Sequence, residues 1–198
     1  MTMRILVAGI LGGIVMFIWT SIAHMVLPLG EAGIREIPNE AAVLDALKTN
    51  LGENRGLYHF PGHGLGPNPT REQEREMMKH MGEKLANNPS GLLMYHPPGR
   101  QVSLGRLLGV EFATEVLEAL LVVFLLAQAG IGTFIGRVGF VFVAGVLAAI
   151  ATNISYWNWY GFPKHYTAAY MLIQVVGFLC VGIVAALVLR KSLARTVA

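Results

Sequence analysis

The stretch E111-F-A-T-E115-V-L-E118-A-L-L-V-V-F-L-L-A-Q128 combines three glutamates with an apolar run. A helix needs about 20 mainly apolar residues to cross about 30 Å of hydrocarbon, and the run at 108–129 has that length. Three further runs of similar length and composition lie at 5–27, 138–156 and 168–189. The sequence therefore predicts an all-α membrane protein built as a four-helix transmembrane bundle.

The composition agrees with a membrane protein. Of 198 residues, 54% are hydrophobic and 14% are charged, whereas about 25% of the residues in soluble domains are charged. The first run ends in Ser21-Ile22-Ala23, which also fits a signal-peptide cleavage site. Because the apolar run continues to Leu27, we expect an uncleaved transmembrane helix. The single cysteine, Cys180, has no partner for a disulfide within the chain.

Lysine and arginine are unevenly distributed around the four runs. Only Lys164 lies in the connection between the third run and the fourth. The opposite side carries Arg4, Arg137, Arg190, Lys191 and Arg195. Short segments rich in Lys and Arg stay in the cytoplasm, so we expect both termini to be cytoplasmic and the long connection at 28–106 to be periplasmic. That connection has nine basic and nine acidic residues, and this balance argues against nucleic acid binding.

The long connection reads as a small α/β cap between the first two transmembrane helices. Helical patterns predict helices at about 38–50 and 70–86, the second opened by a capping box at Thr70-Arg71-Glu72-Gln73. Each is followed by a short phrase bounded by Gly and Pro, which predicts strands at about 56–60 and 91–96 and leaves open whether they pair with each other. We therefore expect a transmembrane helix at 1–27, a periplasmic cap at 28–106, and three helices with a cytoplasmic tail at 107–198.

The three glutamates fall within an arc of about 60° on a helix, so they share one face. We expect Glu111 and Glu115 to be hydrated at the outer interface. Glu118 lies about 10 Å deeper than Glu111, and an exposed acid there would cost at least a few kcal/mol, so we expect it to face the bundle interior or a wet cavity. The predicted outward-opening polar pocket contains Glu111, Glu115, Glu118, His24, Asn153, Tyr156 and His165. A hydrogen-bonded network that only fixes helix packing is the alternative.

A metal or haem site is a second interpretation of these polar residues. Histidine and carboxylate side chains bind zinc, iron or copper, and two histidines from different helices are able to ligate haem. The candidate ligands are His24, Glu115, Glu118, His59 and His96. The glutamates lack the Glu-x-x-His pattern of di-iron bundles, so whether any metal or haem is bound stays open.

Small residues recur at four-residue spacing in two of the apolar runs. Gly9-x-x-x-Gly13 lies in the first run, and the overlapping pairs Ala144-x-x-x-Ala148 and Gly145-x-x-x-Ala149 lie in the third. Such patterns allow close helix approach in a membrane, either within one chain or in an oligomer. The aromatic residues of 156–163 are typical of a membrane interface, with ligand binding as the alternative.

Four phrases of the sequence carry a resemblance. They are S21-I-A-H24-M-V-L-P-L-G-E31-A-G, Y58-H-F-P-G62, Y95-H-P-P-G99 and S155-Y-W-N-W-Y-G-F-P163. Together they resemble a group of small bacterial inner-membrane proteins of unassigned function. The resemblance implies a bacterial inner-membrane location, and it implies no catalytic residues.

The sequence lacks a P-loop, Gly-x-Ser-x-Gly, His-Glu-x-x-His and a cysteine pair, so whether the protein is an enzyme stays open. We expect a non-catalytic subunit, accessory or assembly factor of a membrane complex. Its partners would be the lipid bilayer and either another protein or a second copy, bound through the small-residue helix faces or the cap. The alternatives are an outward-facing metal- or haem-binding redox protein and a small oligomeric transporter, for which acids within the membrane are typical.

Overall fold

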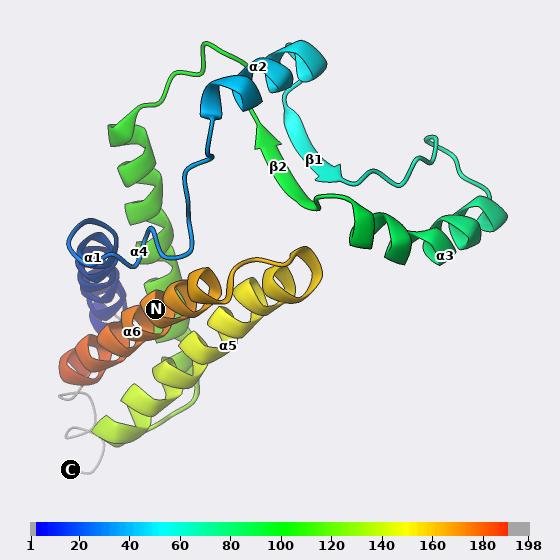
Figure 1. The fold of residues 1–198 in the computed structure, drawn as a ribbon. Helices are drawn as coiled ribbons and strands as arrows, with labels where there is room; N and C mark the ends of the chain where they lie inside the picture. Colours follow the sequence, from blue (N-terminus) through cyan, green and yellow to red (C-terminus); the bar gives the residue numbers. More distant parts are fainter. Residues whose placement is uncertain (1–2, 190–198) are drawn as a thin grey trace, which may run out of the picture. The chain divides into compact units, whose positions relative to one another are not determined.

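The structure is a computed structural model that describes residues 3–189 (Figure 1). Its elements are α1 (Met3–Met25), α2 (Glu40–Leu51), β1 (Gly56–Phe60), α3 (Arg71–Asn87), β2 (Gly91–Tyr95), α4 (Leu104–Gln128), α5 (Phe134–Tyr160) and α6 (Lys164–Leu189). The chain divides into two compact units. We call Met1–Ile34 together with Val102–Ala198 the helical unit, and Arg35–Gln101 the small unit.

Three helices of the helical unit, α1, α5 and α6, are long and apolar enough to cross a membrane. The chain is therefore a multi-pass membrane protein. Helix α4 has 25 residues, which is sufficient length, but every 18-residue window of it contains Glu111, Glu115 and Glu118. Composition alone therefore does not identify α4 as a span, and the fourth transmembrane helix stays a prediction.

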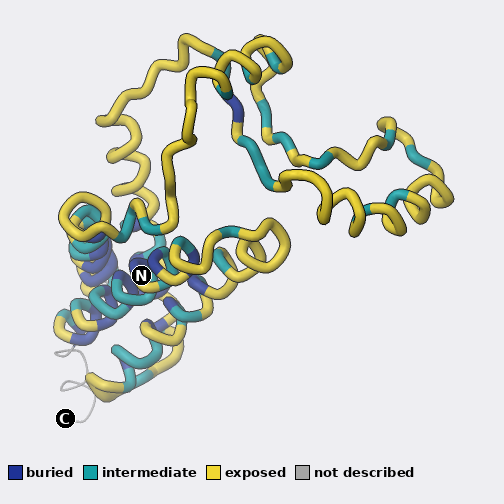
Figure 2. The backbone as a smooth tube through the Cα atoms, in the orientation of Figure 1, coloured by how far each residue is buried: buried dark blue, intermediate teal, exposed yellow. Residues whose placement is uncertain are grey.

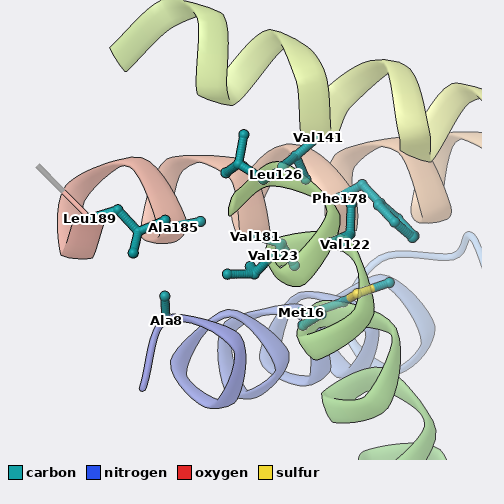
Figure 3. Packing of buried hydrophobic residues seen from close by; sticks show 11 residues of the cluster. Ala8, Met16, Val122, Val123, Leu126, Val141, Phe178, Val181, Ala185 and Leu189 are labelled. Carbon is teal, nitrogen blue, oxygen red and sulfur yellow. The ribbon is translucent and has the colours of Figure 1, made fainter. Parts of the chain in front are cut away.

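The helical unit is held together by apolar side chains between its four long helices. Helix α1 packs against α4 and α6, and α6 packs along α5. Figure 3 shows side chains from all four helices meeting in one cluster. Its labelled members are Ala8, Met16, Val122, Val123, Leu126, Val141, Phe178, Val181, Ala185 and Leu189.

Glycines allow two of these helix pairs to approach closely. A Cβ atom at Gly13 would stand 2.5 Å from the Cα atom of Val116, and one at Gly9 would stand 2.9 Å from the Cα atom of Leu120. A Cβ atom at Gly145 would overlap the side chain of Phe178. The Gly9-x-x-x-Gly13 pattern therefore packs α1 on α4, and Gly145 packs α5 on α6, both within one chain. An oligomer stays a prediction.

The small unit contains α2, α3 and a two-stranded antiparallel sheet formed by β1 and β2. The predicted capping box opens α3: the Gln73 amide donates to Thr70 Oγ1 at 3.3 Å, and the Thr70 amide donates to Gln73 Oε1 at 2.8 Å. Among residues 35–101, Tyr95 is the one buried side chain, and its hydroxyl donates to the Gly52 carbonyl at 2.9 Å. Figure 2 shows that most of the chain of this unit is exposed or half-buried.

Candidate functional site

A cavity of about 590 Å³ lies between the four long helices of the helical unit. Its polar lining consists of Thr20, Ser21 and His24 from α1, Glu111, Thr114, Glu115 and Glu118 from α4, Thr152 and Asn153 from α5, and Tyr170 and Gln174 from α6. The structure thus brings all three glutamates together with His24 and Asn153 around one space. That this cavity has a function is a prediction.

Glu115 is the most deeply buried of the three acids. Its side chain is 4% exposed, whereas Glu118 is half-buried and Glu111 is exposed. The expectation that Glu115 would be hydrated at the interface is therefore wrong, whereas Glu118 lines the cavity, in keeping with the expectation that it would face the bundle interior or a wet cavity. The sequence argument considered depth along the helix, but burial also depends on direction around the helix axis.

The buried residues of α4 define that direction. They are Glu115, Ala119, Val122, Val123 and Leu126, a stripe with the three-to-four spacing of one helix face. Glu115 begins this stripe, and Glu118 lies at its edge. The glycine contacts explain the orientation, because Gly13 packs on Val116 and so turns the neighbouring Glu115 toward the inside of the unit.

The Glu115 carboxylate is incompletely satisfied. Its Oε2 atom is buried and has no hydrogen-bond partner. The polar side chains near the carboxylate are those of Thr20, Glu111, Glu118 and His24. Among the residues that the structure describes, the other unpartnered buried side-chain oxygen is Thr167 Oγ1, which does not line the cavity.

His24 lies at the α1 side of the cavity with its ring fixed by two contacts. Nδ1 is 2.9 Å from the Thr20 carbonyl oxygen, and since a carbonyl only accepts, Nδ1 carries the proton and donates. The ring also meets Tyr170 edge to face, with centroids 5.8 Å apart. Gly30 allows the chain after α1 to fold back beside this ring, because a Cβ atom there would stand 2.5 Å from His24 Cδ2.

An amide and hydroxyl group completes the cavity on the α5 and α6 side. Thr152 Oγ1 lies 3.1 Å from Gln174 Oε1, and Asn153 Nδ2 lies 3.4 Å from the same oxygen. Asn153 was predicted from the sequence, but Gln174, Thr152 and Tyr170 were not. A signal for Gln174 existed, because it is the one amide side chain within the apolar run 168–189.

Two predicted pocket residues are not part of the cavity lining. Tyr156 is exposed and packs on the rings of Tyr160 and Phe162, and His165 is exposed in the first turn of α6. The prediction that they line the pocket is wrong, because both side chains lie near the turn that joins α5 to α6. The exposed aromatic residues there fit the interfacial interpretation.

The five candidate metal ligands belong to different units. His24, Glu115 and Glu118 lie in the helical unit, and His59 and His96 lie in the small unit. His59 pairs with Leu92 across the sheet. Strand β2 ends at Tyr95, one residue earlier than predicted, so His96 lies just after the strand. Within residues 3–189, no group of three or more His, Cys, Asp or Glu side chains is placed to hold a metal ion.

The cavity can accept cations and hydrogen-bond donors. Its charged lining consists of three carboxylates and one histidine, and no lysine or arginine of the described chain lines it. Comparison with protein-family models, curated proteins and solved structures finds no significant match to the chain.

Proposed function

We propose that the protein is a non-catalytic subunit or accessory protein of the bacterial inner membrane that binds a small amphiphilic ammonium compound in the cavity of the helical unit. In this proposal α4 is the fourth transmembrane helix, both termini are cytoplasmic and the small unit is periplasmic. The distribution of Lys and Arg supports this orientation. The packing of α4 along α1, with a continuous buried stripe, supports its placement in the bundle.

The observation that carries the proposal is the unpartnered Oε2 atom of Glu115. A buried polar group without a partner costs about 1–3 kcal/mol, and a charged group costs more. Here the oxygen belongs to a side chain that is 4% exposed and lines a cavity of about 590 Å³. Rotation of the Glu115 side chain would bring this oxygen to the cavity surface, where a ligand that donates a hydrogen bond to it would remove the cost and so bind favourably.

The remaining lining favours an ammonium group over other donors. Glu111 and Glu118 add negative charge near Glu115, so anionic ligands would be repelled. The rings of Phe17 and Tyr170 also line the cavity, and aromatic faces attract ammonium groups.

The rest of the lining suits an apolar portion of the same ligand. Met16, Leu107, Leu108 and Ile173 supply an apolar wall. The cavity volume also lies within the roughly 300–1,000 Å³ usual for small-molecule sites. The compound would therefore carry a cationic head and a short apolar body.

The other interpretations stay predictions. A metal or haem redox site would use His24, Glu115 and Glu118, which lie together at the cavity but do not form a metal-binding group among the described residues. For a transporter, the lining contributed by α4 ends at Glu118, so no specific observation favours a path through the bundle.

A direct binding measurement tests the proposal. Benzylammonium would be titrated against the purified protein in lipid nanodiscs by isothermal calorimetry, with its neutral carbon isostere, ethylbenzene, as the matched ligand. We expect the cation to bind more tightly. The variant Glu115→Gln should weaken its binding by about 10- to 100-fold, since a buried hydrogen bond to a charged group contributes about 1.5–3 kcal/mol.

The control variant is Glu83→Gln, whose side chain is exposed on α3 and which should leave the affinity unchanged. Equal affinity for the cation and its neutral isostere would refute the ammonium assignment. The proposed role as a subunit is tested separately: a partner should co-purify in mild detergent, and isolation of a homogeneous lone monomer would contradict it.

A further inference from the structure

Three side chains that bear soft or borderline metal-binding atoms meet in the small unit. His63 Nδ1 lies 3.3 Å from the Sδ atom of Met77. The ring of His59 stacks on the ring of His63, with centroids 5.1 Å apart and planes inclined by 5°. The three residues come from the end of β1, the loop that follows it and the second turn of α3.

We propose that His63 and Met77, with His59 as third ligand, form a binding site for a soft monovalent metal ion, of which Cu(I) is the biological example. This site lies within the small unit alone and does not depend on the ligand proposed for the helical unit. It also differs from the metal site predicted from the sequence, because neither His63 nor Met77 was a candidate ligand there.

The separation between His63 Nδ1 and Met77 Sδ suits two ligands of one metal ion. With metal–nitrogen and metal–sulfur bonds of about 2.0–2.3 Å, two such atoms stand about 3.3 to 4.4 Å apart for bond angles between about 100° and 180°. The observed 3.3 Å lies at the short end of this range. In the metal-free protein a neutral His63 places one proton on either ring nitrogen. With that proton on Nε2, the Nδ1 lone pair faces the thioether.

His59 is the third ligand in this proposal. Its side chain is exposed at the penultimate residue of β1, and its ring lies against that of His63. Binding requires the His59 side chain to rotate out of this stack, so that a ring nitrogen turns toward the ion. The result is a three-coordinate site with two imidazole nitrogens and one thioether sulfur.

The ligand types select the metal. Thioether sulfur is a soft ligand that favours Cu(I), and imidazole suits copper as well. Charge acts in the same direction, because the Lys84 ammonium donates to the Gly62 carbonyl at 3.1 Å, next to His63. Its repulsion of a divalent ion would be twice that of a monovalent ion.

Helix α3 fixes the geometry of the site. Met77 and Lys84 are seven residues apart, so they lie on one face of α3, and both contact the loop at 62–63. The capping box at Thr70 and Gln73 determines where α3 begins. The loop is therefore held at two points of the same helix face, with His63 opposite the sulfur.

The experiment is a competitive titration of the full-length protein with Ag(I), a redox-inert probe of soft monovalent sites, and with Cu(I) under anaerobic conditions against a chromophoric chelator. The titrations use a Cys180→Ser background as the unmodified protein, because the Cys180 thiol would compete for soft ions, and we expect one tight equivalent of metal for each chain. Zn(II) should bind more weakly, because zinc prefers thiolate, imidazole and carboxylate ligands. A second readout is the NMR signal of the methionine methyl groups, in which the Met77 resonance should shift on addition of Ag(I).

The variant Met77→Leu should weaken Ag(I) binding by at least about tenfold, since even the loss of groups that only support a metal ligand costs about 10- to 100-fold in affinity. His63→Gln should do the same. Met78→Leu is the matched control, because Met78 is the next residue of α3 and its side chain is 70% exposed. Equal loss of affinity in Met77→Leu and Met78→Leu, or no stoichiometric Ag(I) binding by the unmodified protein, would overturn the proposal.

Discussion

Replacement of Glu115 by methionine distinguishes between two roles of this carboxylate, ligand binding and helix packing. Methionine has a similar length and no charge, so Glu115→Met removes the unpartnered Oε2 atom while it keeps the side-chain volume. Glu115 is 4% exposed, and the Thr20 hydroxyl lies near its carboxylate. If the acid fixes helix packing, the variant should be less stable; if the acid is kept for a ligand, the ligand-free variant should be more stable.

The magnitude follows from two opposing contributions. Loss of the interaction with the nearby Thr20 hydroxyl costs about 1 kcal/mol, and removal of an unsatisfied buried polar atom restores about 1–3 kcal/mol. The net expectation is a gain of about 0–2 kcal/mol in the free energy of unfolding. This corresponds to a rise in Tm of up to about 8 °C for a chain of this length. Replacement of buried charges by apolar groups of similar volume is often neutral or stabilising.

The assay is thermal unfolding of the ligand-free protein in one detergent, followed by intrinsic fluorescence and by size-exclusion chromatography of heated samples. Glu111→Met is the control, because Glu111 lies on the same helix and is exposed, so its effect should stay within about 0.5 kcal/mol. A fall in Tm of more than about 4 °C in Glu115→Met alone would refute the reasoning. The carboxylate would then be a structural element of the bundle.

Two further predictions concern packing and topology. Gly13→Ala should lower the free energy of unfolding by about 1–3 kcal/mol, because its Cβ atom would stand 2.5 Å from the Cα atom of Val116. The control Gly82→Ala, where a Cβ atom meets nothing within 4 Å, should not destabilise the protein. An equal loss of stability in both variants would contradict the α1–α4 contact. In a variant without the native cysteine, Ser90→Cys should react in intact cells with a membrane-impermeant thiol reagent and Ala129→Cys should not; the reverse pattern would invert the proposed topology.

Local sequence signals were sufficient where a structural element depends on its own residues. The capping box predicted the start of α3, and the Gly- and Pro-bounded phrases predicted both strands of the sheet. Their register was beyond prediction, because the pairing of His59 with Leu92 depends on how the chain between the strands folds. The structure places Leu57 and Met94 opposite each other as well, so His59 and Met94 share one face of the sheet.

Five of the seven predicted pocket residues line the cavity, but the direction in which Glu115 faces was not predicted. Depth along α4 follows from residue number, but the direction of Glu115 depends on which side of α4 meets α1. A complementary signal was present, because Gly9 and Gly13 have the same four-residue spacing as the residues they contact, Val116 and Leu120. The shared spacing cannot be recognised from one helix alone, because it is a property of the pair of helices that pack together.

The sparse interior of the small unit has a consequence for any protein that docks on it. Residues 35–101 bury one side chain, Tyr95, so little apolar area is removed from water to offset the conformational entropy of the ordered chain. A partner that covers exposed side chains such as Leu57 and Met94 would bury apolar area on binding, and this burial would offset part of the entropy cost. Recognition at this unit would then be specific but readily reversible, with a large negative heat-capacity change as its calorimetric signature.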